Sequence, residues 1–120
     1  MAISIVQHGS NSAAYTTGSS ATLAVTLGSP VTAGNCLVAN IWIPIAPQGV
    51  GFSGTVTGVT SNGAADNWYM GYIVQDDSPN TVTVWVDPNT AGGFTVIDIP
   101  FAFNATASTT NGIAIIADVY

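Results

Sequence analysis

Residues 68–86 alternate between two kinds of side chain with a period of two, and this stretch constrains the fold more than any other feature of the chain. Such alternation is typical of a β-strand whose two faces meet different surroundings. Residues 76–80, DDSPN, interrupt the pattern with turn chemistry, because Pro fixes φ and Asp and Asn side chains cap backbone amides. The stretch therefore predicts an antiparallel β-hairpin. Its alternating positions are Trp68, Met70, Tyr72 and Val74 in the first arm and Val82, Val84 and Val86 in the second.

The rest of the chain also predicts strands, and no segment shows a helical period. Residues 36–45 are the most apolar and are expected to form a central strand, whereas residues 11–20 are rich in Ser, Thr, Gly and Ala and are expected to form a loop. Short strands between turn signals are typical of sandwiches and jelly rolls. We expect residues 1–120 to form one domain, an all-β antiparallel β-sandwich or jelly roll of about eight strands. The other expected strands are residues 3–8, 21–27, 55–60, 94–103 and 113–120, with Pro100 pushing its strand end toward a sheet edge or bulge.

The charge of the chain limits its partners. It has no Lys or Arg and a net charge of −6, carried by Asp. Nucleic-acid binding is not expected, because it requires a basic surface, and any electrostatic partner must bring its own positive charge. No apolar run reaches the roughly 18 residues of a membrane span, and the N-terminus lacks the basic region and apolar run of a secretory signal. We therefore expect no nucleic-acid or membrane partner.

The residues that usually carry catalysis are scarce. At 120 residues the chain is long enough to bury a core without disulfides or metal. His8 is the only histidine and lies in no catalytic motif. Cys36 begins the most apolar segment, so we expect a buried structural thiol rather than a nucleophile. One Cys and one His cannot complete a zinc site. We therefore expect that the protein is not an enzyme and that it binds neither a cofactor nor a metal ion.

The aspartates leave two alternatives beside their ordinary role as turn caps. Asp76, Asp77 and Asn80, or Asp66 with the carbonyl groups of its loop, could supply oxygen ligands to Ca²⁺, although no EF-hand pattern is present. Paired acids for glycoside hydrolysis could come from Asp66, Asp87 and Asp98, but nothing in the sequence pairs them.

The large aromatic residues are more informative. Trp85 shares a strand face with Thr81 and Thr83, and Trp42 shares one with Asn40, so both could lie on the more polar side of their strands. Exposed tryptophans suit a sugar-stacking platform or a protein interface, whereas the third alternative is ordinary core. The interface hypothesis names Trp42, Phe52, Trp85 and Tyr120.

Four segments resemble a small β-sandwich module of bacterial surface proteins and phage virion proteins. They are TAGNCLVANIWI, VTSNGAADNWYMGYI, VTVWVDPNTAGGFTVIDI and the closing IAIIADVY, which together cover most of the chain from Thr32 to Tyr120. The motifs are turn and strand signals, and the chain departs from the pattern at Ser61, Asn62 and Gly63, where the module usually has an acidic residue.

The resemblance implies a structural function. We expect a non-enzymatic virion protein, made in the host cytoplasm, either a phage capsid decoration protein or a small tail protein, which forms a homo-oligomer and docks on a larger protein lattice. The alternative is a carbohydrate-binding β-sandwich module that attaches to a cell surface or host receptor, with a glycan as ligand.

Overall fold

The computed structural model describes residues 5–15, 20–43, 54–62, 66–75, 81–103 and 113–119, and every regular element in these ranges is a β-strand. Within the same ranges no helix is long and apolar enough to cross a membrane. The all-β prediction is confirmed. The strands are β1 (Gly9–Tyr15), β2 (Ser20–Thr26), β3 (Leu37–Ile43), β4 (Gly54–Val56), β5 (Thr60–Ser61), β6 (Tyr69–Gln75), β7 (Thr81–Asp87), β8 (Val96–Phe103) and β9 (Ile113–Val119).

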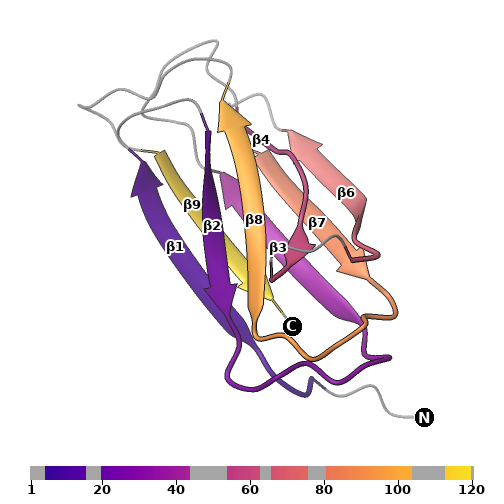
Figure 1. Cartoon of the computed structure of the whole chain (residues 1–120). Helices are drawn as coiled ribbons and strands as arrows, with labels where there is room; N and C mark the ends of the chain where they lie inside the picture. Colours follow the sequence, from indigo (N-terminus) through magenta and orange to yellow (C-terminus); the bar gives the residue numbers. More distant parts are fainter. Residues whose placement is uncertain are drawn as a thin grey trace.

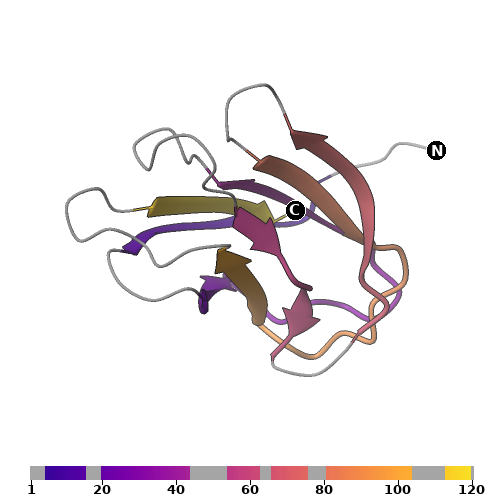
Figure 2. The same cartoon turned by 90° about the horizontal axis from the view of Figure 1, so that it is seen from above.

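The strands form two antiparallel sheets that lie one above the other (Figures 1 and 2). The larger sheet has the order β1-β9-β3-β7-β6, and the smaller has the order β2-β8-β4, with β5 also pairing with β8. Among the described strands only β6 and β7 are neighbours both in the chain and in a sheet, so the predicted hairpin is confirmed. Residues 76–80 lie outside the described part of the chain.

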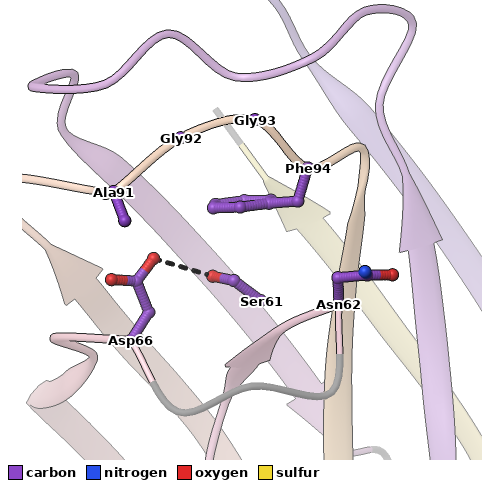
Figure 3. A pocket seen from close by; sticks show the side chains of 7 residues that line it. All are labelled: Ser61, Asn62, Asp66, Ala91, Gly92, Gly93 and Phe94. Atoms are coloured by element: carbon purple, nitrogen blue, oxygen red, sulfur yellow. Dashed lines mark hydrogen bonds between the residues drawn. The ribbon is translucent and has the colours of Figure 1, made fainter.

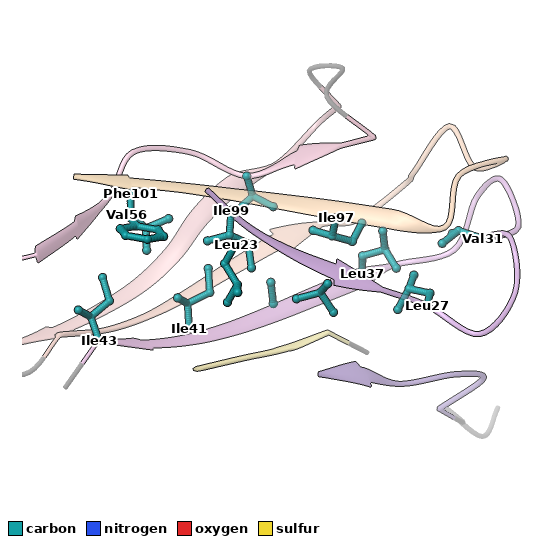
Figure 4. Packing of buried hydrophobic residues seen from close by; sticks show 13 residues of the cluster. Leu23, Leu27, Val31, Leu37, Ile41, Ile43, Val56, Ile97, Ile99 and Phe101 are labelled. Carbon is teal, nitrogen blue, oxygen red and sulfur yellow. The ribbon is translucent and has the colours of Figure 1, made fainter. Parts of the chain in front are cut away.

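The core lies between the sheets, where alternate residues of β2, β3 and β8 face the opposite sheet (Figure 4). On β3, Ile41 and Ile43 are almost completely buried, and Phe101 of β8 is the largest fully buried side chain. Burying one such side chain stabilises the fold by about 1.5–3 kcal/mol. The central position expected for residues 36–45 is confirmed, since β3 lies between β9 and β7. The cluster comprises Leu23, Val25, Leu27, Val31, Leu37, Ala39, Ile41, Ile43, Val56, Val59, Ile97, Ile99 and Phe101.

A β-bulge in β6 changes the predicted pattern of the hairpin. The pairing with β7 shifts between Met70, opposite Trp85, and Tyr72, opposite Val84, so Gly71 is an extra residue. An extra residue reverses the faces of all positions beyond it. The prediction that Met70 and Tyr72 share a face is therefore wrong: Met70 lies on the side toward the core, and Tyr72 lies on the outside.

The expected N-terminal strand begins later than predicted. Residues 5–8 are not in a strand, whereas β1 occupies residues 9–15, most of which were expected to form a loop. β1 pairs along its whole length with β9, from Gly9 opposite Val119 to Tyr15 opposite Ile113. Because a β-ladder is made by backbone groups, a sequence rich in Ser and Ala can join it when a partner strand is present.

The segment expected to form one strand over residues 55–60 is divided into β4 and β5, which both pair with β8. Pro100 explains the division. Thr57 donates its backbone N–H to the Pro100 carbonyl at 2.9 Å. In an antiparallel ladder the N–H and C=O of a residue point toward the same neighbouring strand, so the N–H that Pro100 lacks is missing on the side of Thr57, where β4 ends before β5 begins. Pro100 therefore lies inside a central strand and not at a sheet edge. The alternative of a bulge fits better, because three residues, 57–59, stand opposite two, 99 and 100.

Candidate functional site

Hydrogen-bonded polar side chains gather at one end of the two sheets, around Asp66 and Asp87. Asp66 Oδ2 accepts hydrogen bonds from Ser61 Oγ at 3.1 Å and Thr90 Oγ1 at 3.0 Å, and Asp66 Oδ1 accepts one from the Asn67 backbone N–H at 3.1 Å. Trp68 Nε1 donates to Ser61 Oγ at 3.0 Å. We call Ser61, Asp66, Asp87 and Thr90 the aspartate cluster.

Asp87 is the most deeply buried member of the aspartate cluster, with no exposed surface. Its Oδ1 accepts the Asn89 backbone N–H at 3.1 Å, whereas its Oδ2 is buried without a hydrogen-bond donor among the described residues. Leaving a carboxylate oxygen unpaired inside a protein is costly. The position is a consequence of strand register: Asp87 is opposite Leu37 on the core side of β7.

The two aspartates differ in their affinity for a proton. Burial raises the pKa of Asp87, and the neighbouring Asp66 raises it further through a hydrogen bond and charge repulsion. Burial also acts to raise the pKa of Asp66, but hydrogen bonds from Thr90, Asn67 and Ser61 outweigh it and hold the pKa of Asp66 below its usual value. Asp87 therefore holds a proton more tightly than Asp66 does.

A loop held by backbone bonds forms one wall of a cavity beside Asp66. Residues 90–94 bond to residues 31–35: Gly34 N–H donates to Thr90 O at 2.9 Å, Gly93 N–H to Val31 O at 2.8 Å and Val31 N–H to Phe94 O at 2.9 Å. Figure 3 shows Asp66, Ser61 and the Phe94 ring around the cavity, which has a volume of about 300 Å³. The lining residues are Ser61, Asn62, Asp66, Ala91, Gly92, Gly93 and Phe94.

The geometry does not suit the acid chemistry that the sequence left open. The structure brings Asp66 and Asp87 together, whereas Asp98 lies on β8 opposite Ala24. Glycoside hydrolysis requires two carboxyl groups about 5–9.5 Å apart with a sugar between them. Asp87 is fully buried beside Asp66, close enough for the two charges to interact, so no sugar fits between them. Nor does the described part of the chain place three or more His, Cys, Asp or Glu side chains where they could hold a metal ion. Asp76, Asp77 and Asn80 lie outside the described residues.

A second candidate site is the face of the larger sheet that points away from the core. Trp42, Tyr69 and Tyr72 are 43%, 53% and 63% exposed there, and Val82 is 36% exposed. Register sets these side chains side by side, since Tyr72 is opposite Val84, Val84 is opposite Asn40, and Val82 is opposite Trp42. We call this surface the outer face; its described members on β3, β7 and β6 are Val38, Asn40, Trp42, Tyr69, Tyr72, Val82, Val84 and Val86.

The four residues of the predicted interface have different positions. Trp42 is on the outer face. Trp85 is opposite Ala39 on the core side of β7, partly buried against the core, so its position matches the alternative in which it is ordinary core. The strand face that Trp85 shares with Thr83 is not the solvent-exposed one, since Thr83 is 2% exposed. Phe52 and Tyr120 lie outside the described residues. Tyr69 and Tyr72 were missed, because the bulge conceals their shared face in the sequence.

Cys36 and His8 are both exposed. The expectation of a buried Cys36 is wrong, because the residue precedes the first inward position of β3, Leu37, and alternation turns its side chain outward. An exposed thiol reacts without unfolding. We therefore expect native protein to react with Ellman's reagent at a rate within about tenfold of that of the urea-unfolded protein. Protection of the thiol by a thousandfold or more in the native state would contradict the exposed position.

Comparisons of the chain with protein-family models, with curated proteins and with solved structures found no match. The resemblance to surface and virion modules therefore stays a prediction, and the functional argument depends on the aspartate cluster, the cavity and the outer face.

Proposed function

We propose that this chain is a non-enzymatic virion structural protein, a β-sandwich subunit of the capsid decoration or small tail type, which associates with copies of itself and docks on a larger protein lattice. The observation that carries the proposal is the outer face, where Trp42, Tyr69 and Tyr72 are exposed together. Contiguous exposed apolar surface rimmed by polar groups marks interaction sites, and Trp and Tyr are the residues most enriched among interface anchors.

A second copy of the chain is the occupant that best fits the outer face. Two molecules of net charge −6 repel each other, so they meet most favourably through surface that carries no charge. None of the described outer-face side chains is ionisable near neutral pH, and the register of β9 places Asp118 beside Asn40, at the margin of the patch. When two copies pair through their outer faces, most of the negative charges of one copy stay away from those of the other.

The area of the face supports assembly in a lattice rather than a tight isolated dimer. The three strands of the outer face, about 4.8 Å apart and each of seven residues rising about 3.3 Å, cover roughly 330 Å². Stable isolated complexes bury about 800 Å² on each partner. A contact of this size is weak alone and becomes effective when a lattice holds many copies close together. This is the behaviour required of a decoration or tail subunit.

Replacing Trp42 by Thr tests the outer face. Sedimentation equilibrium of the native protein over a range of concentrations is expected to show reversible self-association in the micromolar to millimolar range. Loss of a Trp anchor costs about 2 kcal/mol or more, which raises the dissociation constant at least roughly thirtyfold. Thr preserves strand propensity, so the fold is expected to remain.

The matched control is Ile73→Thr. Ile73 is 45% exposed, close to the 43% of Trp42, but it lies on the opposite side of the same sheet, opposite Thr83. Equal loss of association in the two variants would show that exposed apolar area in general, and not the outer face, causes association. A protein that stays monomeric at millimolar concentration would refute the proposal.

The carbohydrate-binding alternative is favoured by one detail of the same face. Asn40 lies two residues from Trp42 on the same strand face, and Val84 separates it from Tyr72. An exposed amide near aromatic rings is suited to a sugar, which needs both stacking and hydrogen bonds. This alternative implies a cell-surface or host-receptor location. Glycan binding by the monomer, abolished by Trp42→Thr and retained by Ile73→Thr, would establish it in place of self-association.

A further inference from the structure

The cavity beside Asp66 combines an acid with an aromatic wall. Asp66 and Ser61 contribute polar atoms, whereas Phe94 and Ala91 contribute apolar surface (Figure 3). The cavity volume of about 300 Å³ is larger than a metal ion bound by ligands from the cavity wall would need. It is sufficient for a long side chain. Mixed walls of this kind suit an amphipathic cation, whose alkyl stem packs on apolar surface while its charged end reaches an acid.

The chain has no Lys or Arg to neutralise the acid in the cavity. A Lys or Arg side chain that met Asp66 would have to come from another molecule. Asp87, beside Asp66, is fully buried, and its Oδ2 has no donor among the described residues, although Asp87 does not line the cavity itself. A positively charged group that met Asp66 in the cavity would weaken the charge repulsion between the two aspartates.

We propose that this cavity is a socket for the ammonium group of a lysine side chain on a partner protein. The inference rests on the proposed docking to a larger protein and specifies the chemistry of that partner. In this arrangement the ammonium group meets Asp66, and the methylene stem lies along Phe94 and Ala91.

The hydrogen bonds of Asp66 favour lysine over arginine. A bidentate guanidinium group requires free acceptor capacity on both carboxylate oxygens. Asp66 Oδ2 already accepts from Ser61 and Thr90, whereas the described residues supply Oδ1 with one donor, the Asn67 backbone N–H. A single N–H donor from an ammonium group fits Oδ1 without breaking either hydroxyl bond.

A peptide titration followed by NMR tests the socket on the full chain. The probes are acetyl-Gly-Lys-Gly-amide, the same peptide with norleucine, which keeps the stem without the charge, and the same peptide with arginine. The Trp68 indole N–H, bonded to Ser61, and the backbone amides of Asn67 and Gly92 report on the cavity. We expect saturable shifts with the lysine peptide at millimolar concentration, weaker binding of the arginine peptide and none of the norleucine peptide.

Three variants make the result specific. Asp66→Asn removes the acid, and Ala91→Leu fills the cavity without altering the bonds of Asp66, so each is expected to weaken binding roughly ten- to a hundredfold. Ala91→Leu also keeps the test decisive if Asp66→Asn does not fold. Asp98→Asn removes the same charge from a residue outside the cavity lining, on β8 opposite Ala24 and Thr60, and is expected to change binding less than about twofold.

The outcomes separate the socket from the proposed function. Equal binding of lysine and norleucine peptides, or equal loss in the Asp66 and Asp98 variants, would overturn the socket. Calcium chloride that shifted the same resonances at lower concentration than the lysine peptide would overturn it in favour of a metal site. Self-association through the outer face is measured on the same samples by light scattering. A negative result in the peptide titration therefore does not affect the test of self-association, and the reverse also holds.

Discussion

Gly92→Ala is expected to destabilise the protein by about 3 kcal/mol or more, whereas Gly93→Ala, one residue further, is expected to cost only about 1–2 kcal/mol. Both glycines have positive φ, of 73° and 82°, so both substitutions carry the strain of a left-handed backbone. The two positions differ in the room that they leave for a Cβ atom. A Cβ on Gly92 would lie 2.5 Å from Ala33 N, 2.8 Å from Ala33 Cα and 2.9 Å from Val31 O, whereas a Cβ on Gly93 meets nothing within 4 Å.

The contacts at Gly92 are all with backbone, which cannot move aside as a flexible side chain does. To make room, the loop of residues 90–94 must move away from residues 31–35 and lose bonds such as Gly93 N–H to Val31 O, at 2.8 Å. Each such bond contributes about 0.5–1.5 kcal/mol. Urea unfolding followed by Trp fluorescence measures both variants. Equal destabilisation by the two substitutions would show that the close approach at Gly92 is not part of the fold in solution.

Asp87→Asn is expected to stabilise the protein at pH 7 by about 1–3 kcal/mol and to remove the loss of stability that the native protein shows as the pH rises above the unfolded Asp pKa of about 3.9. The folded pKa of Asp87 is raised by burial and by Asp66. A raised pKa means that the folded state binds this proton more tightly than the unfolded state, whose Asp pKa is about 3.9. The contribution of Asp87 to stability is therefore present below the unfolded pKa and is lost as the pH rises through the folded pKa. Asn has the same shape, stays neutral and can donate to Asp66.

Asp66→Asn is expected to act in the opposite direction, lowering stability at pH 7 by about 2 kcal/mol, because Ser61, Thr90 and Asn67 lose a charged acceptor. The folded pKa of Asp66 is lowered. Its contribution is present above the unfolded pKa of about 3.9 and is lost as the pH falls through the folded pKa. The native protein is thus expected to be most stable under mildly acidic conditions, where Asp87 holds a proton and Asp66 does not.

Thermal unfolding from pH 3 to pH 8 measures both aspartate variants, with Asp98→Asn as the control for the loss of one negative charge. Asp98 lies on β8, opposite Ala24 and Thr60. If the Asp98 variant gained as much stability at pH 7 as the Asp87 variant, relief of general charge repulsion would account for the effect. An Asp87 variant less stable than the native protein at pH 7 would contradict the protonation assigned to the pair.

The two candidate sites were predictable to different degrees. Trp42 could be selected from the sequence because it interrupts an apolar strand on the face of Asn40. Its neighbours Tyr69 and Tyr72 could not be selected, since the bulge at Gly71 places them on that face and alternation alone assigns Tyr72 to the face of Met70. Asp66 and Asp87 were recognised as acids without a known partner. Their contact depends on the loop of residues 90–94 folding against residues 31–35, which no short-range pattern encodes.

Features that depend on neighbouring residues can be predicted from the amino-acid sequence: the all-β class from its period of two, the β6–β7 hairpin from alternation on both sides of residues 76–80, and the inward side of β3 from its apolar run. The pairing of distant strands is visible in the folded protein alone. With that pairing come the strand character of Gly9–Tyr15, the outward side of Tyr72, the burial of Asp87, the partial burial of Trp85 and the cavity beside Asp66. The physical reason is that strand alternation records that a segment has two faces, whereas the register and neighbours that bury one face come from backbone bonds between segments far apart in the chain.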